Sequence, residues 1–431
     1  MKKLFPSGVL HARVIPPGSK SITNRALVIA AAAEGTSVLK GVLDSEDTQV
    51  MRESLSRLGI AWRHDPDSAT LWVEGCGGNR SMAGAVELYC ANSGTTLRFL
   101  TAMCSTWNGT FRLDGIERMR QRPIGDLLHG LRQLGVEIRS EAENDCPPVV
   151  IQTNGLRGGT AQVPGNISSQ FLSGMLMAAV HAQQPTTLEV TGKLVSRPYI
   201  EMTLAVMRAF GGKVEVEGEN RFLLPAGQRY HGCEYVIEPD ASAASYFFAA
   251  AAVAGGEMTV ENLSRNSLQG DIRFCDCLEK MGCEVEYRER EVVVRRRPET
   301  RLHGVEVDMH DISDTAQTLS VVALFADSPT TIRNVANMRV KETDRIHAVV
   351  TELRKLGARV EEFPDGLKVY PLEKWPEKGV RVETWNDHRM AMSFAVAGLK
   401  IPGVVILNPE CTAKTYPHFF EDWEKIRQIG K

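Results

Sequence analysis

The chain has 431 residues, of which 43% are hydrophobic and 24% are charged. These fractions are typical of globular protein and exclude disordered, collagen-like and coiled-coil chains. With 50 basic and 53 acidic residues, the net charge of −3 argues against a dedicated nucleic-acid binder.

The N-terminus and the cysteines indicate a cytoplasmic protein. No apolar run approaches the roughly 20 residues that a membrane span needs, and Pro6 to Gly8 interrupt any signal-peptide core. The nine cysteines contain no paired CxxC motifs. Cys275 and Cys277 form a single CxC, which with Cys283 leaves a metal site open as an alternative to buried, reduced thiols. We expect no membrane and no nucleic-acid partner.

Amphipathic helices recur along the chain and each one ends at a glycine, which in the first five leads into a polar–apolar strand. A glycine at this position is typical of a left-handed helix C-cap. Successive glycines lie 71 to 76 residues apart, which identifies a repeat. The glycine-terminated segments are 48–59, 124–135, 200–211, 272–282, 345–357 and 419–430.

A second, more apolar helix precedes each amphipathic one, and we expect it to be buried because it is apolar nearly all round. Adding the short strand-like runs gives a β-α-β-α-β-β unit that is used six times. The apolar helices are 24–35, 95–105, 170–182, 243–256, 315–326 and 389–399.

Six such units exceed one core, so we expect an α/β protein of two domains with three repeats each and an active site in the cleft between them. Repeat six lacks its final strands because the chain ends, and the run 9–18 is a spare strand that can replace one of them. The predicted domains are 1–18 with 239–431, carrying repeats 4–6, and 19–238, carrying repeats 1–3.

Each buried helix is introduced by a polar cluster. Helix N-caps account for the hydroxyls and amides. N-caps do not account for cations, which are disfavoured at helix N-termini unless an anion lies between the cation and the helix N–H groups. The pattern therefore predicts anion binding by the cations in these clusters and the adjacent loops, namely Lys20, Arg25, Arg98, Arg122, Arg197, Lys341, Arg345, Arg389 and Lys414, with His388 beside them.

Two acids stand among these cations. Asp314 can be a helix cap and Glu342 an ion-pair partner of Lys341. A carboxylate amid cations stays ionised, however, and so suits a general base. Walker A, GxGxxG and GxSxG motifs are missing from the sequence, which argues against ATP, nicotinamide and serine-hydrolase chemistry.

Nine motifs in order along the chain are similar to those of the 5-enolpyruvylshikimate-3-phosphate synthases. The resemblance covers nearly the whole chain and implies an inverse α/β barrel with three repeats in each of two domains. The motifs are PPGSKSITNRAL (16–27), NSGTTLR (92–98), RMRQRPIGDL (118–127), NISSQFLSG (166–174), SRPYIEMT (196–203), RNSLQGDIRF (265–274), RVKETDRI (339–346), NDHRMAM (386–392) and CTAKTYP (411–417).

The resemblance implies transfer of the carboxyvinyl group of phosphoenolpyruvate to the 5-hydroxyl of shikimate 3-phosphate. Phosphate leaves after a tetrahedral intermediate, in the shikimate pathway to chorismate and the aromatic amino acids. No metal or organic cofactor is implied, and we expect a monomer. The two substrates carry about five to six negative charges, which the nine cations can balance.

Matching motifs also imply residue roles. The contacts of shikimate 3-phosphate are expected to be Lys20, Ser21, Arg25, Ser168, Ser169, Gln170, Ser196, Asp314, Asn337 and Lys341. Those of phosphoenolpyruvate are expected to be Lys20, Gly94, Arg122, Gln170, Arg345, Arg389 and Lys414. Asp314 takes the proton of the attacking hydroxyl. Glu342 and Lys20 are expected to take part in proton transfer at the methylene carbon and in the departure of phosphate. His388 is a further catalytic candidate.

Three positions depart from the common family pattern. Phe99 and Ser93 lie near Gly94 and leave sensitivity to glyphosate open, and Ser313 leaves the rigidity of the loop before Asp314 open.

Two rival functions are weaker. The sister transferase acting on UDP-N-acetylglucosamine typically has a reactive cysteine in the loop that here spans 113–123 and contains none. A non-catalytic anion-binding repeat protein would not need both Asp314 and Glu342.

Overall fold

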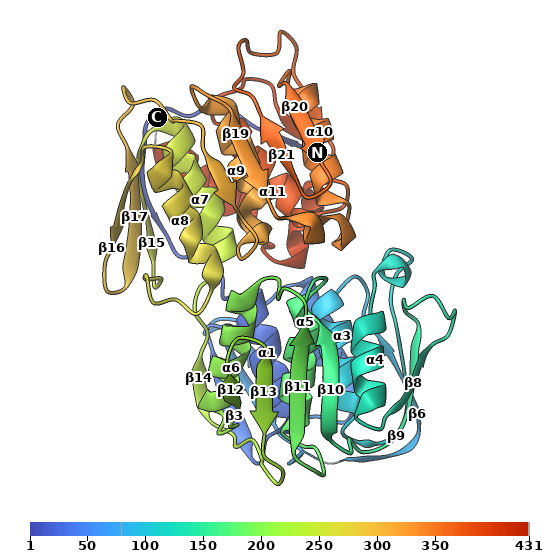
Figure 1. Ribbon diagram of the computed structural model, residues 1–431. Coiled ribbons are helices and arrows are strands. Elements are labelled where there is room, and N and C mark those ends of the chain that lie inside the picture. Colours follow the sequence, from blue (N-terminus) through green and yellow to red (C-terminus); the bar gives the residue numbers. More distant parts are fainter. Residues whose placement is uncertain (79, 430–431) are drawn as a thin grey trace. The chain divides into compact units, whose positions relative to one another are not determined.

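The computed structural model describes residues 1–78 and 80–429. The chain divides into two units. Unit 1 comprises Met1–Pro17 with Glu238–Lys431, and unit 2 comprises Gly18–Ile237. Both units are α/β and each contains three repeats (Figure 1).

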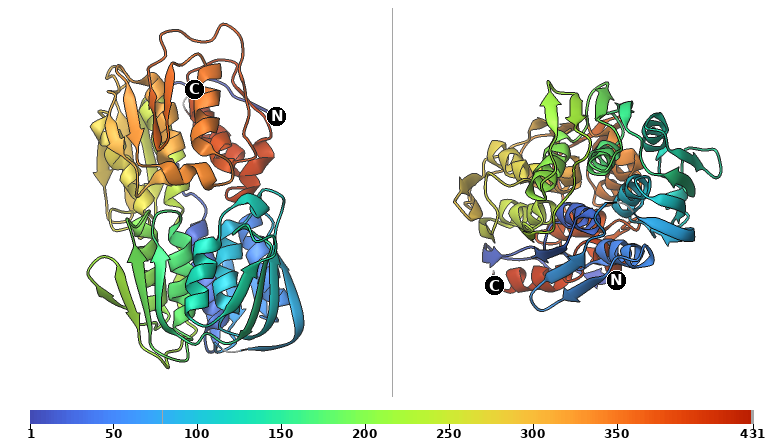
Figure 2. Two further views of the ribbon diagram at one scale, coloured as in Figure 1. Left: turned by 45° about the vertical axis from the view of Figure 1, so that its right-hand side comes forward. Right: turned by 90° about the horizontal axis from the view of Figure 1, so that it is seen from below.

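The apolar helix of each repeat is buried, as the sequence predicts. All residues of α7 (Ala241–Ala254) are buried, and so are those of α3 (Gly94–Cys104) and α11 (His388–Ala397). The others are α1 (Lys20–Ala32) and α5 (Ser169–Ala179) in unit 2 and α9 (Ala316–Val322) in unit 1. In unit 2 these helices lie side by side at the centre, with sheets outside them (Figure 2).

The amphipathic helices pack with one face inward. They are α2 (Glu46–Arg57), α4 (Gly125–Gln133), α6 (Arg197–Ala209), α8 (Phe274–Lys280), α10 (Arg345–Lys355) and α12 (Phe419–Ile429). The glycine after each of the first five has a positive φ, from 75° at Gly59 to 101° at Gly282. That confirms the predicted C-caps, because a side chain is disfavoured in this region of backbone space. Gly430 lies outside the described residues.

Each repeat has its own small sheet. In the five four-stranded sheets a parallel pair of strands is extended by an antiparallel hairpin, and in the three-stranded sheet of repeat six it is extended by a single antiparallel strand. In unit 2 the strand orders are β14-β3-β5-β4, β6-β7-β9-β8 and β10-β11-β13-β12. The strands are β3 (Thr36–Lys40), β4 (Trp62–Asp65), β5 (Thr70–Glu74), β6 (Ser81–Tyr89), β7 (Asn108–Asp114), β8 (Glu137–Ser140), β9 (Val149–Asn154), β10 (Gly159–Pro164), β11 (Thr186–Thr191), β12 (Glu215–Glu217), β13 (Arg221–Leu224) and β14 (Glu234–Val236).

In unit 1 the strand orders are β2-β15-β17-β16, β18-β19-β21-β20 and the three-stranded β1-β23-β22. The strands are β1 (Lys2–Lys3), β2 (Leu10–Val14), β15 (Gly256–Glu261), β16 (Glu284–Tyr287), β17 (Glu291–Arg296), β18 (Glu306–Asp308), β19 (Thr330–Arg333), β20 (Val360–Phe363), β21 (Gly366–Val369), β22 (Arg381–Val382) and β23 (Val405–Ile406).

The N-terminal strand pairs differently from the sequence prediction. The run 9–18 forms β2, which pairs in parallel with β15 of repeat four rather than completing repeat six. Repeat six is completed by β1, which pairs antiparallel with β23. Repeat one obtains its parallel neighbour from β14, which follows repeat three along the chain. The sequence does not reveal this exchange, because a short apolar strand can extend either sheet.

The parallel pairs fix where the polar clusters lie. In βαβ units the helix runs antiparallel to its two strands, so the buried helices of one unit begin at the same end. The polar clusters at those helix starts are thereby brought together within each unit. The described residues include no helix long and apolar enough to cross a membrane.

The cysteines form no disulfide in the described chain, and no three His, Cys, Asp or Glu side chains there are grouped to hold a metal ion. Burial raises the pKa of Cys277 to about 11 and that of Cys283 to about 12. Both thiols are therefore in the protonated form at neutral pH, as expected of buried, reduced cysteines.

Candidate active site

Arg25 is a buried cation at the start of α1 in unit 2, with 1% of its surface exposed. Its Nε donates to Thr203 Oγ1 at 2.7 Å and its Nη2 to Ser173 Oγ at 3.2 Å. The guanidinium carbon also lies 5.2 Å from the centre of the Phe99 ring. Burial lowers the pKa of Arg25 to about 10, so it remains charged at neutral pH. Its hydrogen bonds reach hydroxyls and carbonyls, which leaves its charge available to an anion.

Two further arginines contact residues at the starts of α3 and α5. Arg98 Nη1 donates to Gln170 Oε1 at 2.7 Å, and the Gln170 amide donates to Thr95 Oγ1 at 3.2 Å. Arg122 Nη1 donates to the carbonyl and side-chain oxygens of Asn92 at 3.1 and 3.3 Å. The result is a set of cations held near the N-terminal turns of two helices, as an anion site requires.

Gly94 permits the position of Arg122. A Cβ atom on Gly94 would lie 2.6 Å from Arg122 Nη2. Any side chain there would displace the guanidinium, so the glycine allows Arg122 to lie close to the backbone at position 94.

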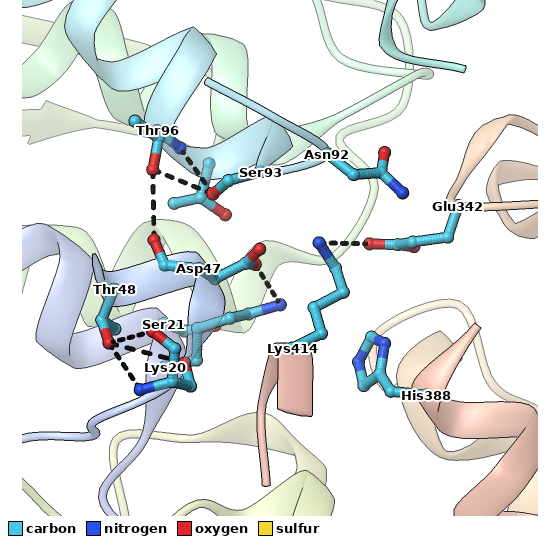
Figure 3. Close-up of polar contacts among 12 residues, drawn as sticks. Lys20, Ser21, Asp47, Thr48, Asn92, Ser93, Thr96, Glu342, His388 and Lys414 are labelled. Carbon is cyan, nitrogen blue, oxygen red and sulfur yellow. Dashed lines mark hydrogen bonds and ion pairs between the residues drawn. The ribbon is translucent and has the colours of Figure 1, made fainter. Parts of the chain in front are cut away.

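Lys20 pairs with a carboxylate that the sequence analysis missed. Its Nζ lies 3.4 Å from Asp47 Oδ2, on α2, whose backbone carbonyl accepts a hydrogen bond from Thr96 (Figure 3). Asp47 lies on a helix of ordinary amphipathic pattern, so nothing in the sequence distinguishes it from a surface acid.

The predicted serines lie at the ends of the same helices. Ser21 and Ser169 are in the first turns of α1 and α5, and Ser168 caps α5 by accepting a hydrogen bond from the N–H of Gln170 at 3.3 Å. Ser196 caps α6 with φ 54° and ψ 47°, in the left-handed region. Arg197, the next residue, instead pairs with Glu201 at 3.2 Å on the same helix.

Arg345 is the centre of the charged cluster in unit 1 and is 2% exposed. Its nitrogens contact Asp387 at 2.7 Å, Glu342 at 2.8 Å and Asp314 at 3.1 Å. Burial opposes its charge, but the attraction of Asp387, Glu342 and Asp314 outweighs burial and raises the pKa of Arg345. Asp387, which also caps α11, belongs to the NDHRM motif but was not singled out in the sequence.

Asp314 and Glu342 each contact several cations. Asp314 lies in the 3-10 turn η3 (Ser313–Thr315), 2.8 Å from Arg389 and 3.7 Å from Lys341. Glu342 Oε1 is 3.9 Å from the Nζ of Lys414, at the end of η6 (Pro409–Lys414; Figure 3). The structure thus brings together within unit 1 all the cations predicted there.

The remaining candidates lie around this cluster. Asn337, in η5 (Ala336–Val340), donates from Nδ2 to Ser313 Oγ at 3.1 Å, which ties the loop before Asp314 to η5. Its Oδ1 is buried and has no hydrogen-bond partner among the described residues. His388 is 1% exposed, with Nδ1 3.5 Å from Asp387 Oδ1.

A buried carboxylate that the sequence analysis did not single out also belongs here. Asp271 is 3% exposed and accepts a hydrogen bond from Ser242. Burial and then the negative charge of Asp314 raise the pKa of Asp271 to about 6. Its motif, RNSLQGDIRF, is visible in the sequence, but its proximity to Asp314 is a product of the fold.

The model of the EPSP synthase (3-phosphoshikimate 1-carboxyvinyltransferase) family matches residues 5–423. This chain belongs to that family. A relative from Nostoc punctiforme named 3-phosphoshikimate 1-carboxyvinyltransferase is 48% identical, with 95% of each chain covered. A chloroplastic relative of the same name from Arabidopsis thaliana is 45% identical over 95% of this chain and 81% of its own length.

Solved structures agree with this family assignment. EPSP synthase from Acinetobacter baumannii superposes with a TM-score of 0.81 at 26% identity, covering 98% of this chain and 97% of that one. The enolpyruvyl transferase NikO from Streptomyces tendae, at 19% identity and a TM-score of 0.79, shares the fold over 98% of this chain and 96% of its own. The predicted α/β fold class is confirmed.

We predict that Arg345→Leu strongly destabilises the protein, because it leaves the carboxylates of Asp314, Glu342 and Asp387 buried without their common cation. The loss in free energy of unfolding is expected to be about 3–5 kcal/mol at pH 7, measured by urea denaturation. Arg333→Gln, which breaks an exposed pair with Glu306, is the control and is expected to cost less than about 1 kcal/mol. Equal losses in the two variants would contradict the role of Arg345.

Proposed function

We propose that this protein transfers the carboxyvinyl group of phosphoenolpyruvate to the 5-hydroxyl of shikimate 3-phosphate and releases inorganic phosphate. The family match and the names of the relatives support this reaction. The observation that carries it is the set of buried cations near helix starts, among which Arg25 donates to neutral hydroxyl and carbonyl oxygens. Substrates that each bear a carboxylate and a phosphate supply the missing negative charge.

The reaction requires three proton transfers. The 5-hydroxyl oxygen attacks C2 of phosphoenolpyruvate and loses its proton, while C3 gains one and becomes a methyl group. The tetrahedral intermediate then loses a proton from that methyl group and expels phosphate, which restores the double bond. No atom of the protein becomes covalently attached.

We assign removal of the proton from the 5-hydroxyl to Asp314. Its contacts with Arg345, Arg389 and Lys341 favour the ionised carboxylate, which is the form that a base needs. Glu342 and Lys20 are assigned to the proton at C3 and to the departing phosphate. His388, held beside Asp387, is the further candidate for this proton.

Shikimate 3-phosphate is assigned to Lys20, Ser21, Arg25, Ser168, Ser169, Gln170, Ser196, Asp314, Asn337 and Lys341. The unpartnered buried Oδ1 of Asn337 supports this assignment, because a ring hydroxyl can donate to it. The positive charge of Arg25 supports the assignment too, because it can pair with a negative group of the substrate.

Phosphoenolpyruvate is assigned to Lys20, Gly94, Arg122, Gln170, Arg345, Arg389 and Lys414. Arginine pairs with carboxylate or phosphate through two parallel hydrogen bonds, which orients the enol for attack. The assigned contacts come from both units, and we propose that both take part in binding. We further propose a cytoplasmic monomer, in line with the free cysteines.

The first test is phosphate release by the purified protein with both substrates, with each alone as a control. We expect release only when both are present, without added metal or nucleotide. Activity with UDP-N-acetylglucosamine in place of shikimate 3-phosphate would identify the sister reaction instead. If no phosphate is released with either acceptor, any transferase function is contradicted.

Asp314→Asn is expected to reduce kcat for phosphate release by about 10²- to 10⁴-fold, because the amide cannot accept the hydroxyl proton. Asp311→Asn, which alters an exposed partner of Arg273 three residues earlier, is the control. Full turnover by Asp314→Asn would remove the base assignment.

Gly94→Ala is expected to raise the KM for phosphoenolpyruvate by about 10- to 100-fold, the cost of losing one charged hydrogen bond. The KM for shikimate 3-phosphate is expected to stay unchanged. Gly84→Ala, whose Cβ would meet nothing within 4 Å, is the matched control. If both variants bind phosphoenolpyruvate as the wild type does, Arg122 is not part of this site.

A further inference from the structure

Glu352 is a fully buried carboxylate, 0% exposed, on an amphipathic helix of unit 1. It lies on α10, five residues before the C-cap glycine Gly357. The first four repeats offer a direct comparison, because the same helical position in each of them is also buried. Uncharged residues occupy it in the first four repeats, namely Ser54, Gly130, Val206 and Cys277. The repeat therefore does not need a charge at this position.

Burying a carboxylate is costly unless hydrogen bonds replace the lost water. Glu352 Oε2 accepts a hydrogen bond from the backbone N–H of Glu383 at 3.1 Å, and Oε1 accepts one from Trp385 Nε1 at 3.0 Å. The Nζ of Lys355 lies 2.8 Å from Oε1. Two of these partners belong to the segment that leads from β22 into α11.

That segment contains an unusual turn. The N–H of Asp387 donates to the carbonyl of Thr384 at 2.9 Å, and the two residues between them, Trp385 and Asn386, have φ of 54° and 53°. A bulky residue such as tryptophan disfavours this left-handed region, and it persists only where surrounding contacts fix it. Glu352 fixes the turn on one side, and Asn408 Nδ2 donates to Asn386 Oδ1 at 3.2 Å on the other.

The turn determines where α11 begins. Asp387, the last residue of the turn, accepts hydrogen bonds from the N–H of Arg389 at 2.8 Å and from Arg345 Nε at 2.7 Å. Arg389 in turn donates to Asp314 at 2.8 Å. A shift of the turn would therefore move two cations assigned to phosphoenolpyruvate.

We propose that Glu352 is a positioning residue for the phosphoenolpyruvate contacts, acting through the 384–387 turn on Asp387, Arg345 and Arg389. This role rests on the proposed function for its kinetic meaning, but the structural link from Glu352 to the turn does not. The carboxylate touches no predicted substrate contact itself; it accepts two donors from the segment whose geometry the site needs.

Glu352→Gln tests the proposal with little change in size. Glu383 and Trp385 donate to different oxygens of Glu352, and a glutamine replaces one of these oxygens by an NH₂ group, so one donor loses its acceptor. We expect the KM for phosphoenolpyruvate to rise about tenfold or more, because small displacements of binding groups carry large costs, and the KM for shikimate 3-phosphate to rise less.

Two further variants complete the kinetic test. Cys277→Ala changes packing at the equivalent position of repeat four and is expected to leave both KM values unchanged even if the Tm falls. Trp385→Phe removes the indole N–H while keeping the carboxylate, and is expected to raise the KM for phosphoenolpyruvate in the same direction. It keeps the test decisive if Glu352→Gln does not fold. A Glu352→Gln enzyme with a lower Tm but wild-type KM values would overturn the proposal.

A spectroscopic readout separates this inference from the proposed function. In protein labelled with ¹⁵N-tryptophan, the indole N–H resonance of Trp385 can be assigned by its loss in Trp385→Phe. We expect it to shift in Glu352→Gln and not in Cys277→Ala. An unchanged resonance would overturn the link, whatever the kinetics. Failure of wild-type phosphate release with a shifted resonance would instead contradict the proposed function and remove the kinetic role.

Discussion

An apolar helix that is buried along its whole length can present polar groups only at its ends. In α7 every side chain is buried, and α3 and α11 are the same. The parallel strand pairs orient such helices alike within a unit, so their N-terminal turns gather at one end. Those turns carry the free N–H groups and the adjacent cations, which makes this end of each unit a natural place for anions.

The two units keep their cations charged by different means. In unit 1, Arg345 lies among Asp314, Glu342 and Asp387, and the carboxylates outweigh the cost of burial. In unit 2, Arg25 is held by Thr203 and Ser173 instead, and burial lowers its pKa. A bound anion is attracted more strongly by a cation whose partners are neutral, because no carboxylate offsets its charge. Carboxylates beside a cation are instead available for proton transfer. We therefore assign anchoring to Arg25 and proton transfer to the acids of unit 1.

Two departures from the common family pattern acquire a physical reason in the structure. Phe99 is fully buried, and its ring lies near the guanidinium of Arg25. Ser313 accepts a hydrogen bond from Asn337, so the loop before Asp314 is tied down without a proline. Both substitutions keep a charged or polar site residue in place.

The sequence by itself determined the repeat, the buried and amphipathic helices and the glycine caps, because these depend on local periodicity and on backbone conformation. It also supplied the cations, since charge at an apolar helix start is locally anomalous. Only the tertiary structure decided that β2 extends repeat four and β1 repeat six, because strand pairing joins residues far apart in the chain. For the same reason it alone revealed Asp47 beside Lys20, Asp387 beside Arg345 and Glu352 beneath the 384–387 turn. Each is an ordinary acid in the sequence, and its contacts are formed only when folding brings its partner to it.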